Sequence, residues 1–290
     1  MSVLSSMLSS TEIFELGIFL TSIVAGIVGS LFGLGGGVII VPVLTLVFGI
    51  DIRYAIGASL ISVIGTSSGA AAVFIKDRLT NVRVAMLLEV ATTIGALTGA
   101  TISAFIPTPL LFFIFSLLLF YSAYSMNKKK GSRGLAEQSA DPLALKLQLN
   151  SSYPDSNLGK EISYTVQRVR LGLSLMFGAG ILSGLLGIGS GALKVPAMDR
   201  AMKLPLKVSS ATSNFMIGVT AAASAGTYYM RGDILPMVAA PVALGVLVGA
   251  AIGTRLMLRI SSVRLRKYFT VILVLIAVQM TFRALGVTAK

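Results

Sequence analysis

Lys194 is the one basic residue that lies inside an apolar stretch of this sequence, in GIGSGALKVPAM. If that stretch enters a bilayer, a charge at such depth costs at least about 2.5 kcal/mol unless it faces water, a partner or a ligand. One interpretation makes the Lys194 ammonium the counter-charge for an anion in a transport pathway. The other has the ammonium snorkel to the membrane interface or pair with Asp199.

Glu89, in LLEVATTIG, is the second ionisable residue in an apolar setting. A carboxyl group inside a membrane helix can carry a coupling proton, which makes Glu89 a candidate coupling residue. Its position close to the inner end of its apolar segment favours the alternative of an interfacial role.

Two glycine-rich stretches, one in each half of the chain, are predicted to interrupt helices. Their members are Gly33, Gly35, Gly36 and Gly37 in the first half, and Gly187, Gly189, Ser190 and Gly191 in the second. Backbone amides freed by such a break are costly in hydrocarbon but tolerable where they line a polar cavity. A helix that begins after the break directs the positive end of its dipole at that cavity, which predicts an anion site. The alternative is that the glycines only let helices pack closely.

Hydroxyl and amide side chains follow each glycine tract along the chain. Ser67 and Ser68 follow the first tract, and Asn214 follows the second. These side chains either donate hydrogen bonds to substrate oxygens or make ordinary hydrogen bonds between helices. With the glycine tracts and Lys194 they form the set of candidate substrate-binding residues.

Several kinds of chemistry are disfavoured by what the sequence lacks. Cys and His are both absent, which excludes disulfides and removes the usual ligands of zinc, haem and iron–sulfur clusters. GLGGGV at 33–38 lacks the last glycine of a dinucleotide-binding motif, and no Walker A sequence is present. We therefore expect no cofactor, no metal site, no catalytic residue and no enzymatic activity.

The composition places these residues in a membrane. The chain is 55% hydrophobic and 12% charged, with a mean hydropathy of +0.88, whereas soluble domains carry about 25% charged residues. Apolar runs of about 17 to 25 residues recur along the chain, as bilayer crossing requires. The net charge of +13 comes from short clusters of Lys and Arg between apolar runs, a distribution typical of membrane topology rather than of nucleic-acid binding. No signal peptide is expected, because no basic residue precedes Arg53.

The apolar runs predict an all-α polytopic membrane protein with about five hydrophobic segments in each half. The expected segments are 13–32, 36–48, 54–75, 84–106 and 110–126, then 171–188, 191–199, 208–230, 234–254 and 268–284. The second segment of each half is too short to span comfortably and contains a proline, which predicts a broken or re-entrant helix. Between the halves lies a polar linker, 127–168, with room for one short amphipathic helix.

The two halves share an internal repeat. Residues 25–44 align without a gap to residues 179–198 at an offset of 154, and the same offset pairs Gly95 with Gly249. A constant offset over so long a stretch indicates duplication. Because five segments per half is an odd number, the second repeat must be inverted in the membrane, and inverted-repeat transporters bind substrate where their broken helices meet. We divide the chain into a first transmembrane repeat (1–126), the linker (127–168) and a second, inverted transmembrane repeat (169–290).

The basic residues predict the orientation of the protein. If the linker is cytoplasmic, most of the 24 Lys and Arg residues lie on the inner side, as the positive-inside rule requires. We therefore expect a multi-pass protein of the cytoplasmic membrane with a cytoplasmic linker.

The stretch SLFGLGGGVIIVPVL, repeated as LLGIGSGALKVPAM, resembles the sulfite exporter TauE/SafE family of membrane permeases. The AIGASL segment, the basic KDRLTNVR loop and the variable linker are similar to that family too. The second copy departs from the family pattern in reading GIGSG and in containing Lys194. The resemblance implies a secondary transporter that moves sulfite, an organosulfonate or another small anion, commonly outward, by alternating access. An anion channel and a non-catalytic membrane subunit are the alternatives; no nucleic-acid partner is expected.

Overall fold

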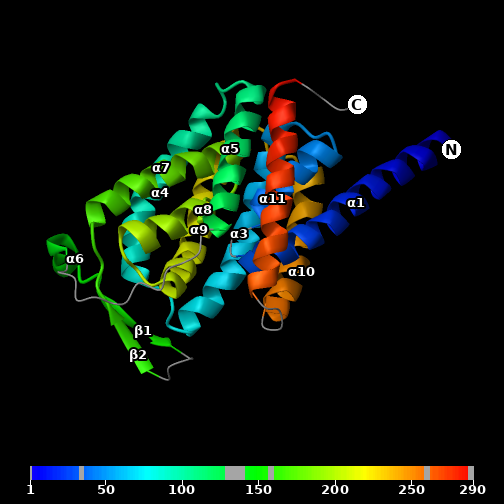
Figure 1. Cartoon of the computed structure of the whole chain (residues 1–290). Helices are drawn as coiled ribbons and strands as arrows, with labels where there is room; N and C mark the ends of the chain where they lie inside the picture. The colour runs from blue at the N-terminus through cyan, green and yellow to red at the C-terminus, as the bar shows by residue number, and fades with distance from the viewer. Residues whose placement is uncertain (1, 33–35, 128–140, 156–159, 258–261, 287–290) are drawn as a thin grey trace.

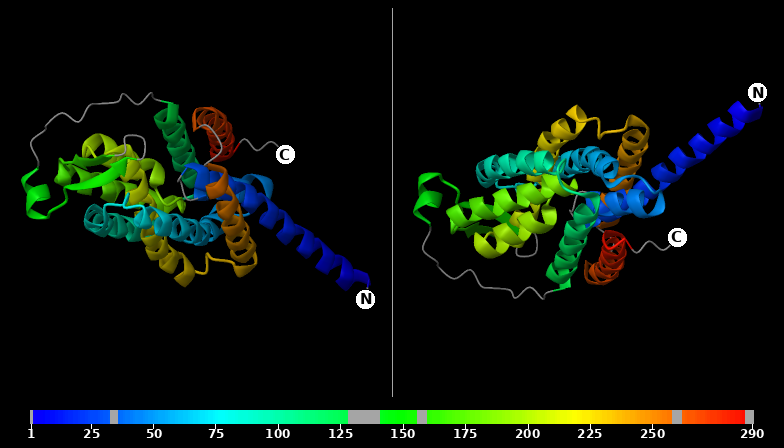
Figure 2. Two further views of the ribbon diagram at one scale, coloured as in Figure 1. Left: turned by 90° about the horizontal axis from the view of Figure 1, so that it is seen from below. Right: turned by 90° about the horizontal axis from the view of Figure 1, so that it is seen from above.

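The structure, a computed structural model, is a bundle of helices that cross at varied angles (Figure 1). It describes residues 2–32, 36–127, 141–155, 160–257 and 262–286. The long helices are α1 (Ser2–Phe32), α3 (Ile52–Lys76), α4 (Val82–Ile102), α5 (Thr108–Asn127), α7 (Val169–Leu186), α9 (Leu206–Met230), α10 (Pro236–Met257) and α11 (Ser262–Ala284). The N-terminal end of α1 extends beyond the bundle in every view (Figures 1 and 2).

The helices confirm a polytopic membrane protein. Within the described residues, six helices are long and apolar enough to cross a bilayer: α1, α3, α4, α5, α7 and α10. Shorter apolar helices cover Gly37–Val47 and Thr270–Ala284. Gly37–Val47 spans about 16 Å at 1.5 Å per residue, about half of a hydrocarbon core of roughly 30 Å.

Both short segments have the same local structure. Helix α2 (Gly37–Pro42) continues into the π-helical turn η1 (Val43–Val47), and α8 (Gly191–Pro196) continues into η2 (Ala197–Ala201). Each contains a proline, Pro42 or Pro196, at its junction with the π-turn. Proline removes a backbone donor, and a π-turn is a common way of accommodating the disturbed hydrogen bonding.

The elements of the two halves follow the offset seen in the sequence. Adding 154 to the bounds of α2, η1 and α3 gives those of α8, η2 and α9. Helix packing repeats as well, because α1 packs along α10 and α7 packs along α4. A Cβ added to Gly26 would lie 2.5 Å from the carbonyl oxygen of Val246, and one added to Gly180 would lie 2.2 Å from that of Thr92. The first long helix of each half therefore packs against the glycine-containing helix of the other half, α1 against α10 and α7 against α4.

The linker differs from the expectation of an all-α protein. It contains the short helix α6 (Pro142–Lys146) and an antiparallel hairpin of β1 (Ser151–Asp155) and β2 (Lys160–Tyr164). The hairpin lies beside α6 at one end of the bundle (Figure 1). Tyr153 and Tyr164 are buried in a cluster with residues of α4, η2 and α9. The all-α prediction was thus wrong for the linker, since these side chains pack two short strands against the bundle.

Asn81, the N-cap of α4, links the bundle to the linker by hydrogen bonds. Its side-chain oxygen accepts a hydrogen bond from the Val84 amide at 3.0 Å. Its side-chain nitrogen donates to the carbonyl oxygen of Leu149 at 2.8 Å and to the Tyr164 hydroxyl at 2.9 Å. One residue therefore both caps a membrane helix and holds two parts of the linker.

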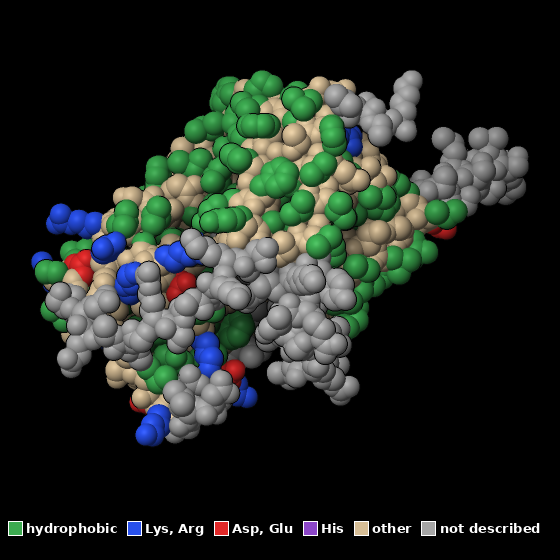
Figure 3. Space-filling view, viewed as in Figure 1, with side chains coloured by type: hydrophobic (Ala, Val, Ile, Leu, Met, Phe, Trp, Pro, Cys, Tyr) green, Lys and Arg blue, Asp and Glu red, His purple; other side chains and the backbone are tan. Residues whose placement is uncertain are grey.

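Charge is unevenly distributed over the surface. In Figure 3 the upper part of the visible face is covered mainly by apolar side chains, and Lys and Arg side chains gather at the end that carries α6 and the hairpin. Exposed large apolar side chains are numerous on the long helices, including Leu117, Tyr124 and Leu275. Such a surface suits lipid along the helices and water at the linker end.

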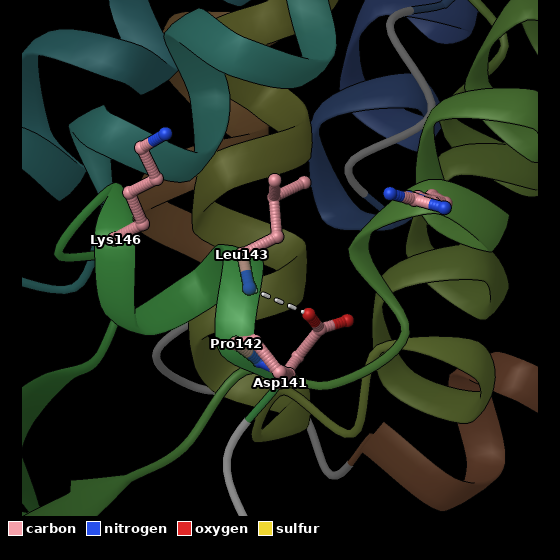
Figure 4. Close-up of a pocket in the computed structure, with 5 residues that line it drawn as sticks. Asp141, Pro142, Leu143 and Lys146 are labelled. Carbon is pink, nitrogen blue, oxygen red and sulfur yellow. Dashed lines mark hydrogen bonds between the residues drawn. The ribbon is translucent and has the colours of Figure 1, made fainter.

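Asp141 joins α6 to α7 and is expected to make that joint sensitive to acid. Its carboxylate accepts hydrogen bonds from the Leu143 amide at 2.8 Å (Figure 4) and from the Val169 amide at 2.9 Å. The bonds from Val169 and then Leu143 lower the pKa of Asp141 below its ordinary value of 3.8. A depressed pKa means that the stabilisation is present above pH 3.8 and is lost as pH falls through the folded-state pKa.

We expect hydrogen-exchange protection of the Leu143 and Val169 amides, corrected for intrinsic rates, to fall in acid. Asp141→Asn has one acceptor oxygen in place of two, so one of the two amides should lose its hydrogen-exchange protection at neutral pH. The protection of both amides in this variant should then not change further as the pH is lowered. Equal protection in both proteins at neutral pH would show that Asp141 does not hold this joint.

Candidate functional site

The two glycine tracts meet inside the bundle. A Cβ on Gly37 would lie 2.9 Å from the carbonyl oxygen of Gly187 and 2.6 Å from the Ser59 hydroxyl. Ser59, on α3, donates a hydrogen bond to that same Gly187 carbonyl at 2.8 Å. The breaks of the two halves therefore touch one another, and α3 bridges them.

Neighbouring positions of the second tract are packed as tightly. Gly189 has a φ of +69°, a conformation that residues with a Cβ rarely adopt. A Cβ there would lie 2.7 Å from Ile217 on α9 and 2.9 Å from Val63 on α3. Val63 also lies 3.0 Å from the Cβ position of Gly37, so one side chain contacts both tracts. The glycines are required by this close packing, whatever else they do.

Each tract contains a residue in the left-handed region that immediately precedes the short helix. Gly36 has a φ of +71° and is the N-cap of α2, while Ser190 has a φ of +53° and is the N-cap of α8. The two carbonyls accept the first hydrogen bonds of their helices. Gly191, the first residue of α8, is buried. Gly33 and Gly35 lie outside the residues that the structure describes.

Ser190 presents a polar group without a described partner. Its side chain is 1% exposed, and its hydroxyl has no hydrogen bond within the described part of the chain. Buried hydroxyls are nearly always hydrogen-bonded, to protein, water or a ligand. Ser190 is therefore a buried hydroxyl of the second tract whose hydrogen-bonding capacity the described residues do not use.

Lys194 is enclosed by protein and is paired. Its side chain is 0% exposed, and its ammonium lies 3.6 Å from the Glu89 carboxylate. The structure differs from the alternative in which Lys194 snorkels to the membrane interface or pairs with Asp199. The Lys194 side chain is enclosed, and its salt bridge is to Glu89. Glu89 is only 6% exposed, so its carboxylate is enclosed by protein.

Thr220 connects the two charged groups. The Lys194 ammonium donates to the Thr220 hydroxyl at 2.5 Å, and that hydroxyl donates to the Glu89 carboxylate at 2.6 Å. Thr93 donates a second hydrogen bond to the same Glu89 oxygen, at 3.2 Å. The three helices α4, α8 and α9 are thus joined through one buried polar cluster, Lys194–Thr220–Glu89.

Sequence reasoning missed Thr220 and Ser59. The internal offset could have indicated the first, since Thr220 is the counterpart of Thr66 in the hydroxyl-rich segment after the first break. Ser59 lies in AIGASL, close to the first break, yet no periodicity distinguishes it from its small neighbours.

The other predicted polar residues are less central. Ser67 and Ser68 donate to the carbonyl oxygen of Ile64, at 3.1 Å and 2.7 Å, and Ser68 is exposed. Ser67 also lies against Gly218 of α9. Asn214 is buried and donates to the Ser210 carbonyl within its own helix at 3.1 Å. The hydrogen bonds described for these residues are therefore local, and none reaches a glycine tract.

No metal-binding group is evident where the structure describes the chain: no three His, Cys, Asp or Glu residues lie close enough together to hold an ion. A cavity of about 310 Å³ lies between α6 and α7 and is lined by Asp141, Pro142, Leu143, Lys146 and Arg170, none of which belongs to a glycine tract (Figure 4). A second, of about 380 Å³, includes Asp51, Phe112 and Arg283 in its lining. The candidate site thus consists of packed interior groups rather than of either cavity.

Comparison with known proteins matches most of the chain. The profile of the sulfite exporter TauE/SafE family covers residues 18–280. The probable membrane transporter protein YunE of Bacillus subtilis (strain 168) is 26% identical over 270 residues, which cover 91% of this chain and 96% of YunE. YdhB of the same organism, also described as a probable membrane transporter protein, is 26% identical over 82% of this chain and 88% of its own length.

An archaeal relative extends the comparison. The probable membrane transporter protein MJ0441 of Methanocaldococcus jannaschii is 25% identical over 86% of this chain and 88% of its own length. No solved structure matches the chain significantly.

Proposed function

The chain belongs to the sulfite exporter TauE/SafE family, and from that premise we propose that it is a secondary transporter that exports a small anion by alternating access. Sulfite or an organosulfonate is the substrate class that the family description suggests. Six apolar helices and three relatives described as probable membrane transporters support this proposal. The chain works in this account without catalytic chemistry and without a resident cofactor.

The transport mechanism rests on two inverted repeats. The matching bounds of α2–η1–α3 and α8–η2–α9 support a duplicated unit. An odd number of segments per repeat inserts the second unit from the opposite side, and rocking of one repeat against the other then opens the shared centre to each side in turn. The accumulation of Lys and Arg at the linker end supports a cytoplasmic linker and location in the cytoplasmic membrane.

The observation that carries the proposal is the contact between the two glycine tracts. Gly37 meets Gly187 across the interface of the halves, and Ser190, three residues after Gly187, has a hydroxyl without a hydrogen bond among the described residues. Because a Cβ added to Gly37 would lie 2.9 Å from the Gly187 carbonyl oxygen, the described residues of the two tracts leave no space between them for an anion. In our proposal this conformation is occluded, and the tracts separate when substrate enters.

The proposed substrate-binding residues are those of the two tracts together with nearby polar groups. They comprise Gly33, Gly35, Gly36, Gly37, Gly187, Gly189, Ser190, Gly191, Lys194, Ser67, Ser68 and Asn214. Backbone amides at the breaks and the Lys194 ammonium supply positive potential, and the hydroxyls supply hydrogen bonds. Glu89 is the proposed coupling residue.

Counterflow in proteoliposomes tests this function. If the protein is a carrier, proteoliposomes loaded with sulfite, thiosulfate or sulfoacetate should take up the labelled anion faster than empty ones. The uptake rate should saturate as the external anion concentration rises. A channel would instead pass current without exchange. The same anions should raise the unfolding temperature of the purified protein, because a ligand that binds only the folded state stabilises it. Currents without trans-stimulation, or neither binding nor flux, would contradict the proposal.

A further inference from the structure

Lys194 has no free charge to offer an anion in this conformation, because the Glu89 carboxylate is already beside it. One Glu89 oxygen lies 3.6 Å from the Lys194 ammonium and has no hydrogen bond of its own in the described structure. The other oxygen is held by Thr220 and Thr93. In a low-dielectric interior this carboxylate compensates the charge of the ammonium.

We propose that the Glu89 carboxylate competes with the transported anion for Lys194, so that the anion binds there only as Glu89 takes up a proton. The inference rests on the proposed function and adds to it a coupling between anion binding and proton uptake. An anion placed beside an ionised Glu89 would share one cation with a second negative charge, which is costly in the membrane interior. A proton from the aqueous side to which the site is open forms an O–H bond on Glu89. The Lys194 ammonium then exchanges its carboxylate partner for the anion.

The equivalent site, related to this one by the internal repeat, shows that the fold does not need this charged pair. Subtracting 154 from Lys194 and Thr220 gives Ile40 and Thr66, and adding 154 to Glu89 gives Ala243. The Thr66 hydroxyl lies 3.0 Å from the Ser62 carbonyl oxygen, and the Thr220 hydroxyl lies 2.9 Å from the equivalent carbonyl oxygen of Met216. The threonine is therefore kept at both sites. The charged pair joins Glu89 of the first repeat to Lys194 of the second, and both charges are missing at the equivalent site. This points to a role for the pair that the apolar site does not have.

The pair lies one helical turn from the glycine contact. Ile217, against which Gly189 packs, and Thr220 are three residues apart on α9 and so lie on one face of that helix. Lys194 lies four residues after Ser190, and the Ser190 carbonyl accepts a hydrogen bond from the Lys194 amide. An anion at the second tract would therefore be within reach of a Lys194 side chain released by Glu89.

No other described charge is paired with the cluster. The remaining titratable residues of α4, α7, α8–η2 and α9 that the structure describes are Arg83, Arg170, Asp199, Arg200, Lys207, Tyr228 and Tyr229. Of these, the buried Tyr228 hydroxyl lies within hydrogen-bonding distance of the Ser103 hydroxyl and of two backbone carbonyls of α7, away from the cluster. The others are exposed or half-buried. Glu89 is thus the group whose proton would respond to an anion at Lys194.

Isothermal titration of the purified full chain with thiosulfate, methanesulfonate and sulfoacetate tests the coupling, since these anions stay ionised near neutral pH. Titration in buffers of different ionisation enthalpy measures proton uptake. The wild type should take up about one proton per anion, and its Kd should rise about tenfold per pH unit once Glu89 is ionised in the free protein. Glu89→Gln imitates the protonated carboxyl group, so its Kd should be independent of pH and binding should take up no proton.

Asp199→Asn is the matched control, because it removes a nearby carboxylate that is outside the cluster, and it should behave as the wild type does. Anion binding by the wild type without proton uptake, or proton uptake retained in Glu89→Gln, would overturn the coupling and leave the transport function intact. Absence of binding and flux for all three anions in the wild type would overturn both. Tighter binding by Glu89→Gln than by the wild type at alkaline pH would support the competition, since damage to the fold would weaken binding.

Discussion

Lys194→Ile should lower the free energy of unfolding by about 3 to 5 kcal/mol, because it leaves the Glu89 carboxylate buried without its cation. The wild-type side chains are almost wholly enclosed, and the Thr220 hydroxyl alone cannot replace the lost charge. The loss is measured by denaturant or thermal unfolding of the purified protein in detergent. Anion binding should be lost in the same variant.

The double variant Glu89→Ala/Lys194→Ile is the control for this result. It places at these two positions the residues found at their repeat counterparts, Ala243 and Ile40. Replacing both members of a buried ion pair by apolar groups is often neutral or stabilising. We expect it to unfold close to the wild type while failing to bind anions. The two single variants and the double variant form a cycle that isolates the interaction energy. If the single and double variants are equally unstable, the ion pair is not what stabilises this region.

Gly180→Ala should destabilise the contact between α7 and α4 by about 1 to 3 kcal/mol through overpacking. Its new Cβ would lie 2.2 Å from the carbonyl oxygen of Thr92, which is backbone and cannot move aside cheaply. Thermal unfolding in detergent measures the effect, and counterflow shows whether the closely packed seam is also needed for transport.

Gly178→Ala, two residues earlier on the same helix, provides the comparison. Nothing lies within 4 Å of a Cβ at Gly178, and both substitutions gain up to about 1 kcal/mol of helix propensity. The difference between them therefore reports the clash alone. Gly26→Ala should repeat the loss at the equivalent contact of α1 with α10. Similar stabilities for Gly178→Ala and Gly180→Ala would mean that the helices are not packed as the structure has them.

Features carried by local residue patterns could be read from the sequence. The offset between residues 25–44 and 179–198 anticipates the equal spacing of the short helices, because identical glycines and prolines break the chain at equivalent points. Apolar length anticipates the membrane helices, since a bilayer imposes a minimum span.

Features that depend on contacts between distant segments were not predictable in this way. Glu89 and Thr220 are 131 residues apart, and nothing in either segment indicates the other. Lys194 was recognised as a costly charge, but its partner was not identified, because a helix face cannot be matched to its neighbour from one sequence. The hairpin was missed because SSYPD and KEISY are short and polar, and their burial depends on the cluster that includes Tyr153 and Tyr164.

The central claim, that an anion passes between the two glycine tracts, is tested most directly by a single thiol at the second tract. The sequence contains no Cys, so Ser190→Cys introduces the sole thiol of the chain at a position that is 1% exposed. The account predicts that a membrane-impermeant thiol reagent modifies it slowly in proteoliposomes, and that a transported anion slows the modification further. Ser151→Cys, at an exposed position of the linker hairpin outside the proposed binding residues, should show no such protection. Modification of Ser190→Cys at a rate that no transported anion changes would contradict the claim.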